Sequence, residues 1–460
     1  MNRSLYENYL GILRQELIPA LGCTEPISIA YACALARRTL GSLPEQIEVG
    51  CSGDIIKNVK SVTVPNSGGL KGIEAAAVLG AVAGKPEKGL EVLEAVNSQD
   101  IELTKSLLEA GLCHYSLIEG EDGLMIKARL LAGQHTSEVV IAGSHTSIQS
   151  ITFDGQPIKQ SEEWTASALS SATETPNTAL VDEDGFAAAT NAAPSPVVPD
   201  KAALTVKDIL EFAECLDLND VEDLFSRQLS MNNAIADEGL SNPYGAQIGK
   251  TILSVYGNSV STRARARAAA GSDARMSGCP LPVVINSGSG NQGITVSLPV
   301  NEYAKELGAS KDKLFRALAI SNLIAIHQKH FIGSLSAYCG AVCASCGAGA
   351  AITYLHGGDY ETIGQTIINT IANIGGMFCD GAKPSCAAKI ASSVDAAILA
   401  HHLSHEKRGF LPGEGLVGDE LEETIRSIGY IGRVGMHEAD TEILKVMSHE
   451  VSSEELDEGL

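Results

Sequence analysis

The stretch TIGQTIINTIANIGGMFCDGAKPSCAAKIASSVDAAILA, residues 362–400, places a cysteine-bearing loop between two helical patterns. Apolar residues recur at helical spacing on both sides of the loop: Ile363, Ile367, Ile371 and Ile374 before it, and Ile390, Val394, Ala397 and Ile398 after it. This spacing puts the apolar side chains on one face of each helix. The loop, GGMFCDGAKPSC (375–386), is rich in Gly, Asp and Pro. The stretch therefore predicts a helical domain whose helices position Cys379 and Cys386 for burial or for metal binding.

The helical pattern continues through most of the chain after Leu204, whereas the preceding part changes period. Short runs rich in β-branched residues predict strands: QIEVGC (46–51), SVTVP (61–65), CHYSLIE (113–119), LMIKARLLAG (124–133), SEVVIAG (137–143) and SIQSITFDG (147–155). Two helical stretches, near 72–83 and 89–110, interrupt these strands. We therefore predict an α+β protein, with a mostly α-helical catalytic domain and a smaller α/β domain inserted near the N-terminus.

Domain boundaries follow the changes in composition. Residues 1–45 are predicted to be N-terminal helices that carry GCTEP (22–26) and pack on the catalytic domain, and residues 46–160 are predicted to form the small α/β domain. Residues 161–204 are rich in Ser, Thr, Ala, Asp and Pro, which is typical of a linker or a surface excursion. The helical catalytic domain is then predicted to cover 205–460.

The charge and the cysteine count exclude several classes of protein. A formal net charge of −23 argues against nucleic acid or an anionic membrane as a partner, because binding phosphate needs clustered Lys and Arg. The opening residues lack the apolar core of a signal peptide, and no uncharged run of about 18 apolar residues predicts a membrane span. Eleven cysteines, an odd number, argue against a disulfide framework. We expect a cytoplasmic protein that acts on a small molecule, and a homo-oligomeric state stays open.

The cysteines near residue 340 allow two readings. CGAVCASC (339–346) has the C-x3-C-x2-C spacing of radical S-adenosylmethionine enzymes, but those enzymes carry the motif on a loop of a βα barrel. Here the cysteines fall on one face of a Gly- and Ala-rich helix, so we interpret Cys343 and Cys346 as packing residues. Cys339 instead groups with Cys379 and Cys386. Zinc would usually need a C-x2-C knuckle and a fourth ligand, whereas three thiolates alone suggest a four-iron cluster with one open iron.

A glycine-rich segment, NSGSGNQG (286–293), contains G-x-G-x-x-G. The β-rich context of a dinucleotide-binding fold is absent around it, so the motif alone is weak evidence. Successive backbone N–H groups and polar side chains could instead bind a carboxylate, and a plain glycine-rich turn stays open. The residues predicted to form this anion site are Ser287, Gly288, Ser289, Gly290, Asn291 and Gln292.

Three other motifs carry candidate catalytic groups. GCTEP places Cys23 at a predicted helix N-terminus, where the helix dipole favours a thiolate and so a base or nucleophile, although Glu25 acts in the opposite direction. GSHTSI (143–148) places His145 after a strand, either as a hydrogen-bonded structural histidine or as a site residue. SDARM (272–276) offers Arg275 for a carboxylate or for a structural ion pair.

Five motifs in this order resemble the bacterial and archaeal L-cysteine desulfidase family, which is related to the α-chain catalytic domain of iron–sulfur L-serine dehydratases. The motifs are PALGCTEPISIA (19–30), GSHTSI, SDARM, NSGSGNQGIT (286–295) and CDGAKPSCAAK (379–389). The resemblance implies a [4Fe–4S] enzyme that eliminates hydrogen sulfide from L-cysteine to give pyruvate and ammonia. It implies cluster ligands at Cys339, Cys379 and Cys386 and a proton acceptor at Cys23, and no pyridoxal phosphate is expected.

The resemblance also implies a mechanism. An open iron would act as a Lewis acid on the β-substituent while Cys23 removes the α-proton. From their polarity alone, the Gly/Ser loop 287–293 is expected to hold the substrate carboxylate, with Asn66 or Ser67 as further candidates, and His145 is expected to orient the substrate. Some relatives cap the cluster with a C-terminal cysteine, but no cysteine follows Cys386 here, so the fourth iron is expected to be open. An L-serine dehydratase is the alternative, and a radical enzyme or a non-catalytic metal protein is more remote.

Overall fold

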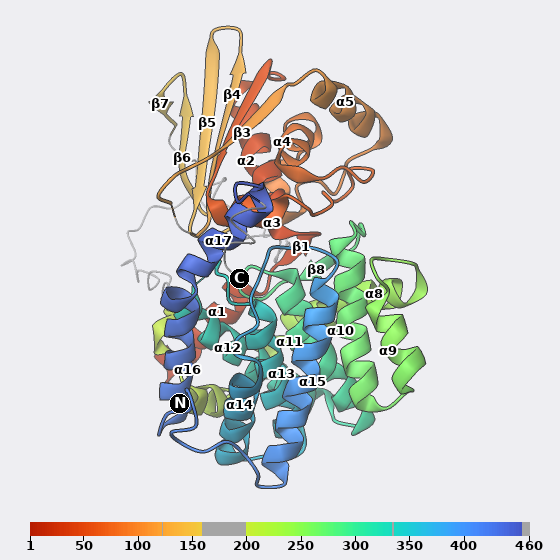
Figure 1. The fold of residues 1–460 in the computed structure, drawn as a ribbon, viewed down its shortest axis with the longest axis vertical. Coiled ribbons are helices and arrows are strands. Elements are labelled where there is room, and N and C mark those ends of the chain that lie inside the picture. The colour runs from red at the N-terminus through yellow and green to blue at the C-terminus, as the bar shows by residue number, and fades with distance from the viewer. Residues whose placement is uncertain (122, 159–198, 334, 453–460) are drawn as a thin grey trace, which may run out of the picture.

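The computed structural model describes residues 1–121, 123–158, 199–333 and 335–452. Helices dominate it and a single larger sheet lies near the N-terminus, so the prediction of a mostly helical α+β fold is confirmed. Figure 1 shows the sheet with its helices as one lobe and the long helices as a second lobe. Residues 161–198 of the predicted excursion lie outside the described residues, and the predicted domain boundaries stay predictions.

The sheet lobe contains six strands in the order β3-β2-β4-β5-β6-β7. Their bounds are β2 (Gln46–Cys51), β3 (Cys113–Leu117), β4 (Met125–Ala132), β5 (His135–Ala142), β6 (Ile148–Phe153) and β7 (Gln156–Pro157). Only β2 and β3 pair in parallel. The register aligns Val49, Ala128, Val139 and Ile151 as one buried row across four strands. This row lies on the side of the sheet that α2 covers, since α2 contacts β4 and β5.

The predicted strand SVTVP is wrong. In the structure, residues 61–65 form an irregular loop with one isolated bridge, between Thr63 and Lys71. Val62 and Val64 are buried, so the alternation in the sequence reflects burial. The prediction failed because apolar and polar residues can alternate in a buried loop as they do in a strand, even where no neighbouring strand is present to pair with.

The remaining elements near the N-terminus are helical apart from the short strand β1. They are α1 (Arg3–Glu16), β1 (Pro19–Leu21), α2 (Thr24–Leu40), α3 (Gly53–Val59), α4 (Gly72–Ala83), η1 (Pro86–Glu91) and α5 (Ser98–Glu109). The longest of them, α2, packs on α4 on one side and on the sheet on the other. It is therefore buried nearly all round, which explains its low amphipathic character.

The helical lobe is built around α13, which packs against α11, α12, α14 and α15. Its elements are η2 (Lys201–Ala203), α7 (Val206–Cys215), η3 (Leu218–Asp220), α8 (Glu222–Ser241), α9 (Ile248–Tyr256), α10 (Val260–Met276), β8 (Pro282–Val284), α11 (Gly290–Glu306), α12 (Lys311–Ile332), α13 (Gly340–Leu355), α14 (Tyr360–Ile374), α15 (Cys386–His405), α16 (Leu421–Tyr430), η4 (Ile431–Gly435) and α17 (His437–Ser448). Small residues let neighbouring helices approach α13 closely. A Cβ on Gly347 would lie 2.3 Å from the carbonyl oxygen of Ser321 on α12. Cys343 and Cys346 are fully buried in this packing.

Two connections join the lobes. The strand β1 pairs antiparallel with β8, with Ala20 opposite Val283, and so brings the segment after β1 beside the segment after β8. The C-terminal helix α17 leaves the helical lobe and packs on α3 (Figure 1). These connections place residues distant in sequence at one junction.

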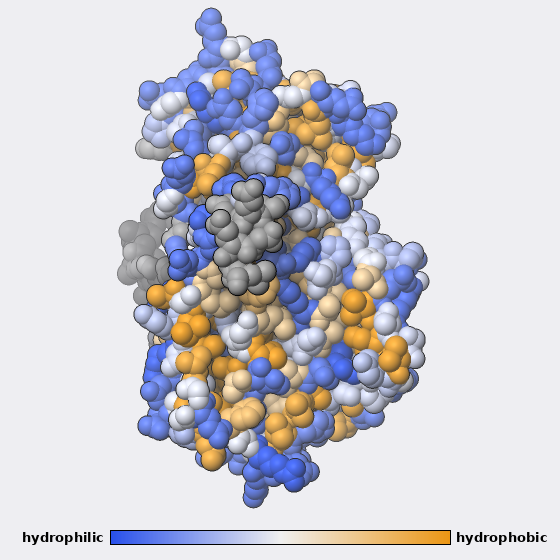
Figure 2. Space-filling model, viewed as in Figure 1, coloured by the Kyte–Doolittle hydropathy of each residue, from blue (hydrophilic) through white to orange (hydrophobic). Residues whose placement is uncertain are grey.

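The surface differs between the lobes. Figure 2 shows that apolar side chains gather over the helical lobe on the face in view, whereas the outer part of the sheet lobe is mainly polar. None of the described helices is both long enough and apolar enough to cross a membrane.

Candidate active site

A cavity of about 110 Å³ lies where the two lobes meet. Most residues predicted for the site line it, from both parts of the chain: Cys23, His145, Ser287, Gly288, Ser289, Asn291, Gln292, Cys339, Cys379 and Cys386. Glu25, Asn58, Arg275, Lys329 and Lys389 also line it. The structure therefore brings together motifs that are up to 363 residues apart in the sequence, from Cys23 to Cys386.

Four helix N-termini converge on this cavity. Cys23, Ser289 and Cys339 are the N-cap residues of α2, α11 and α13, and Cys386 is the first residue of α15. The N-terminus of a helix carries unpaired N–H groups and a partial positive charge. The cavity therefore favours negatively charged groups, such as a carboxylate or thiolates.

Backbone pairing brings the three candidate metal-binding cysteines together. The N–H of Cys339 donates to the carbonyl of Met377 at 3.0 Å, and the N–H of Cys379 donates to the carbonyl of Ala337 at 2.5 Å. These bonds flank an antiparallel bridge between Tyr338 and Phe378. The segment before α13 thus lies alongside the loop that precedes α15, and Cys386 begins α15 at the same cavity.

Side-chain contacts hold the cysteine loop in place. Lys389 donates to the carbonyl of Phe378 at 2.8 Å and pairs with Asp380 at 2.5 Å. Gly381 has φ +89°, and a Cβ there would lie 2.4 Å from the carbonyl oxygen of Lys57 on α3. Only glycine fits this close approach, so the loop is pressed against the sheet lobe.

The three thiols have few partners of their own. The Cys339 sulfur is next to the backbone N–H of Ala341, and the Cys386 sulfur lies 3.7 Å from the carbonyl of Gly381. Burial, together with the nearby Cys379 and Cys386, raises the pKa of Cys339 to about 12. Three thiolates around one cavity repel one another unless a cation compensates their charge. Soft thiolate donors around a shared cavity fit an iron–sulfur cluster.

A single metal ion does not fit the described residues as they are arranged. Across the described ranges, no group of three or more His, Cys, Asp or Glu side chains is placed to hold a metal ion.

Cys23 and Glu25 form a buried pair. The Cys23 thiol donates to Glu25 Oε2 at 2.9 Å, and the Thr24 hydroxyl lies 3.1 Å from the same oxygen. Burial raises the pKa of Cys23 well above its usual range, the negative charge of Glu25 raises it further, and Arg275 opposes the effect. The expectation that the helix N-terminus would favour a Cys23 thiolate is therefore wrong, because burial and Glu25 outweigh the dipole.

Glu25 itself stays ionised. Burial opposes its charge, but His145 and the Cys23 thiol outweigh burial and hold its pKa at about 2. The Nε2 atom of His145 lies 3.9 Å from Glu25 Oε1, too far for a hydrogen bond, and has no hydrogen-bond partner among the described residues. The other side of the His145 ring supports the glycine-rich loop, since a Cβ on Gly288 would lie 2.9 Å from its Cε1 atom.

Arg275 provides a buried cation beside the N-terminus of α11. Its side chain is 2% exposed, and its Nε has no hydrogen-bond partner among the described residues. A Cβ on Gly290 would lie 2.2 Å from that Nε, so glycine lets the guanidinium reach the helix end. The amide oxygens of Asn291 and Gln292 are buried and likewise without partners in the described part of the chain. A site that offers both donors and acceptors without partners suits a zwitterionic ligand.

Three predicted residues do not line the cavity. Gly290 lies behind it, against Arg275. Asn66 donates to the carbonyl of Leu93 at 2.9 Å, and the hydroxyl of Ser67 donates to the carbonyl of Val64 at 2.7 Å. The proposed substrate roles of Asn66 and Ser67 are therefore corrected, because both side chains stabilise a loop of the sheet lobe.

The polar lining residues Asn58, Lys329 and Lys389 were not singled out from the sequence. Lys329, in the last turn of α12, is 7% exposed and has no ion pair with any described residue, but nothing in its local sequence marks it. Glu25 belongs to GCTEP. Its position two residues after Cys23, at a predicted helix start, indicated that the two side chains could lie close together.

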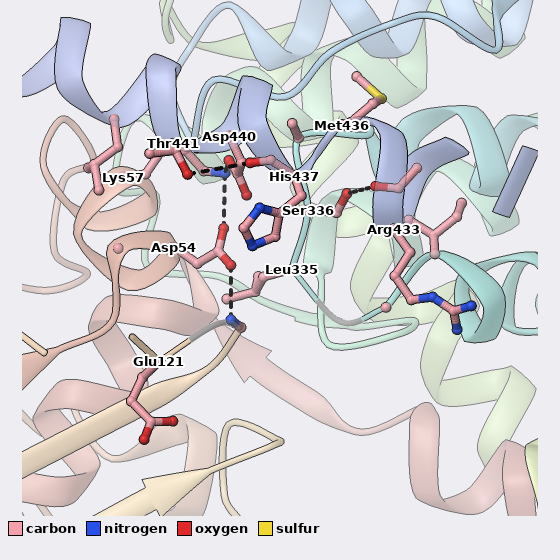
Figure 3. Close-up of a pocket in the computed structure, with 17 residues that line it drawn as sticks. Asp54, Lys57, Glu121, Leu335, Ser336, Arg433, Met436, His437, Asp440 and Thr441 are labelled. Atoms are coloured by element: carbon pink, nitrogen blue, oxygen red, sulfur yellow. Dashed lines mark hydrogen bonds and ion pairs between the residues drawn. The ribbon is translucent and has the colours of Figure 1, made fainter. Parts of the chain in front are cut away.

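A second cavity, of about 300 Å³, lies beneath α17 (Figure 3). The buried Lys57 contacts Asp54 Oδ1 at 3.0 Å and also pairs with Asp440 of α17. Leu335 and Ser336 line both cavities, so one loop separates them. Although larger, this cavity contains none of the cysteines, and its ion pairs join α3 to α17.

Comparisons with known proteins agree with this geometry. A family model described as serine dehydratase alpha chain matches residues 87–445. The chain is 49% identical to a UPF0597 protein of Lachnoclostridium phytofermentans, over 96% of this chain and 100% of the relative. It is 46% identical to UPF0597 proteins of Desulfitobacterium hafniense and Finegoldia magna, over 97% and 96% of this chain and 98% and 99% of the relatives.

Proposed function

Because this chain belongs to the serine dehydratase alpha-chain family, we propose that it is an iron–sulfur lyase that eliminates hydrogen sulfide from L-cysteine, giving pyruvate and ammonia. The observation that carries the proposal is the single cavity that Cys339, Cys379, Cys386 and Cys23 line together. A cysteine trio with a separate thiol beside it is the donor set that such a reaction needs.

Cys339, Cys379 and Cys386 would hold the [4Fe–4S] cluster. When bound, the cluster would supply Lewis-acid activation of the sulfur that leaves from the β-carbon. A soft leaving group such as a thiol suits iron better than a hydroxyl, which favours L-cysteine over L-serine. L-Serine dehydration by the same residues is the second candidate, and it is supported by the description of the matching family model.

The chain's own residues would bind and orient the amino acid. Arg275 and the N-terminus of α11 would bind the carboxylate, since the Nε of Arg275 has no partner among the described residues and the helix end carries a partial positive charge. The unpartnered oxygens of Asn291 and Gln292 would accept from the substrate ammonium group. This orientation would direct the α-hydrogen toward Cys23, which would receive the α-proton.

The same proposal includes the setting of the protein. We propose that it works in the cytoplasm on a small amino acid, without nucleic acid or a membrane as partner. The acidic composition supports this setting.

An anaerobic assay tests the proposal. The reconstituted protein is given L-cysteine or L-serine, and sulfide, pyruvate and ammonia are measured. We expect sulfide and pyruvate in equal amounts from L-cysteine, and less pyruvate from L-serine. Faster pyruvate formation from L-serine would make the protein a serine dehydratase. A requirement for S-adenosylmethionine, or zinc in place of iron and sulfide, would contradict the proposal.

A further inference from the structure

Glu25 is the only carboxylate among the described residues that line the active-site cavity. The other charged side chains around it are the cations Arg275, Lys329 and Lys389. Glu25 is 8% exposed, and its Oε2 accepts the hydrogen bond from the Cys23 thiol at 2.9 Å. A buried carboxylate is costly unless it has partners, so its place beside the reactive thiol calls for a functional explanation.

The direction of this hydrogen bond limits what Cys23 can do alone. The thiol hydrogen lies between the sulfur and Glu25 Oε2, and a protonated thiol cannot accept a second proton. The raised pKa of Cys23 and the low pKa of Glu25 agree with a resting thiol beside a carboxylate. Cys23 can therefore receive a proton from substrate only if its own proton leaves toward Glu25.

We propose that Glu25 is the proton acceptor behind Cys23, so that the thiol passes its proton to Oε2 as its sulfur takes the α-proton of the amino acid. This inference rests on the proposed elimination. As the C–S bond breaks, its electron pair leaves with the sulfur as hydrosulfide. The proton on Glu25 then passes to the hydrosulfide, which leaves as hydrogen sulfide. Cys23 ends as a thiol and Glu25 as a carboxylate, so both residues return to their starting state.

His145 faces the second oxygen of Glu25. Its Nε2 lies 3.9 Å from Glu25 Oε1 and is otherwise without a partner in the described part of the chain. The carbonyl of His145 accepts a hydrogen bond from Ser28 of α2 at 2.6 Å, so the loop and the helix that carry the two residues are joined. In this arrangement His145 is a positioning residue.

The decisive variant is Glu25→Gln. Glutamine has the same shape and can still accept the thiol hydrogen bond, but its amide oxygen does not take up a proton near neutral pH. We expect kcat for L-cysteine to fall by about 10²-fold or more, with KM changed by less than about threefold. A Glu25→Gln variant with the wild-type kcat, or one that is active while Glu25→Ala is not, would show that Glu25 only positions Cys23. Glu138→Gln, on the outer face of the sheet, is the matched control.

A second readout does not depend on turnover. Iodoacetamide labelling of Cys23 is followed by mass spectrometry, with the exposed Cys215 of the same sample as reference. We expect Glu25→Gln to raise the labelling rate of Cys23 relative to Cys215 by about threefold or more, because loss of the Glu25 charge lowers the pKa of the thiol. If the wild type eliminates from neither amino acid, the proposed function fails, and labelling still decides the role of Glu25. Equal labelling rates for Cys23 in the wild type and in Glu25→Gln would overturn the role of Glu25.

Discussion

Cys379 enters the cavity from a loop, whereas Cys339 and Cys386 enter it from helix starts. The three sulfurs belong together because residues 337–339 pair with 377–379. By contrast, Cys346 lies deep in α13 and approaches the carbonyl of Ile367 at 3.7 Å. Cys346 therefore lies apart from the cysteine trio, although Cys339 and Cys346 belong to one sequence motif.

Replacement of Cys379 by serine should remove the cluster. Serine keeps the size of the side chain but replaces a soft thiolate by a hydroxyl, a poor ligand for iron. Iron and sulfide analysis after anaerobic reconstitution should fall from about four irons per chain to less than about one. The matched variant Cys346→Ser should retain its iron. Loss of iron from Cys346→Ser with retention in Cys379→Ser would favour the radical-enzyme reading of CGAVCASC.

Replacement of Gly290 by alanine should weaken substrate binding. The added Cβ would lie 2.2 Å from Arg275 Nε, so the guanidinium must move away from the N-terminus of α11. We expect KM for the amino acid to rise by about tenfold while the iron content is unchanged. Gly376→Ala is the control, because a Cβ there meets nothing within 4 Å. An unchanged KM would remove Arg275 from the carboxylate site.

At the scale of elements, Asp273 shows how one helix is held by another. Its Oδ2 accepts from the N–H of Ile248 at 2.7 Å, so a residue of α10 caps the start of α9. Burial raises its pKa to about 6, although backbone N–H groups at the start of α9 oppose the shift. Asp273, which belongs to the SDARM segment, is thus a capping residue.

The raised pKa of Asp273 predicts a pH dependence of stability. Between about pH 4 and pH 6, Asp273 keeps its proton in the folded chain but releases it in the unfolded chain. Its contribution to the free energy of unfolding is therefore lost as the pH rises through 6. Asp273→Asn keeps an oxygen for Ile248 and carries no charge. We expect the unfolding free energy of the variant, measured by denaturant unfolding, to exceed that of the wild type by about 1 to 3 kcal/mol at pH 7. Below pH 4 the two unfolding free energies should be equal. An equal difference at both pH values would contradict this explanation.

Over the whole molecule, the cavity depends on how the lobes meet. Cys23 and His145 come from the part of the chain that forms the sheet lobe, and the cysteine trio comes from the helical lobe. Lys57 contributes to this junction twice, since its ammonium pairs with Asp54 and Asp440 and its carbonyl lies beside Gly381. Figure 3 shows Asp54 of α3 and Asp440 of α17 at this junction, where Lys57 of α3 pairs with both.

Replacement of Lys57 by methionine should loosen the junction. Methionine fills similar space but leaves Asp54 and Asp440 facing each other without a cation. We expect a loss of about 3 kcal/mol in unfolding free energy and faster proteolytic release of α17. Lys127→Met, whose ion pair with Glu138 lies on the exposed sheet face, should change stability by less than about 1 kcal/mol. Equal effects of the two variants would show that the junction does not depend on Lys57.

Much of this fold could be predicted from the periodicity of apolar residues in the sequence. The isoleucine stripe in 362–400 predicted α14 and α15, and alternating residues predicted β4 to β6, because each face of a helix or strand is buried or exposed as a unit. The strand predicted at 61–65 failed because whether a strand forms depends on a neighbour that local sequence does not specify.

The sequence by itself determined most of the helices and strands and the residues able to do chemistry, since these follow from local spacing and side-chain type. Only the tertiary structure decided which of those residues meet and in which direction their pKa values shift. Asn66 and Ser67 looked as suitable as Ser287 but lie elsewhere, and burial beside Glu25 raises the pKa of Cys23. The physical reason is that pKa values and ligand sets depend on burial and on neighbours distant in sequence, and packing alone sets both.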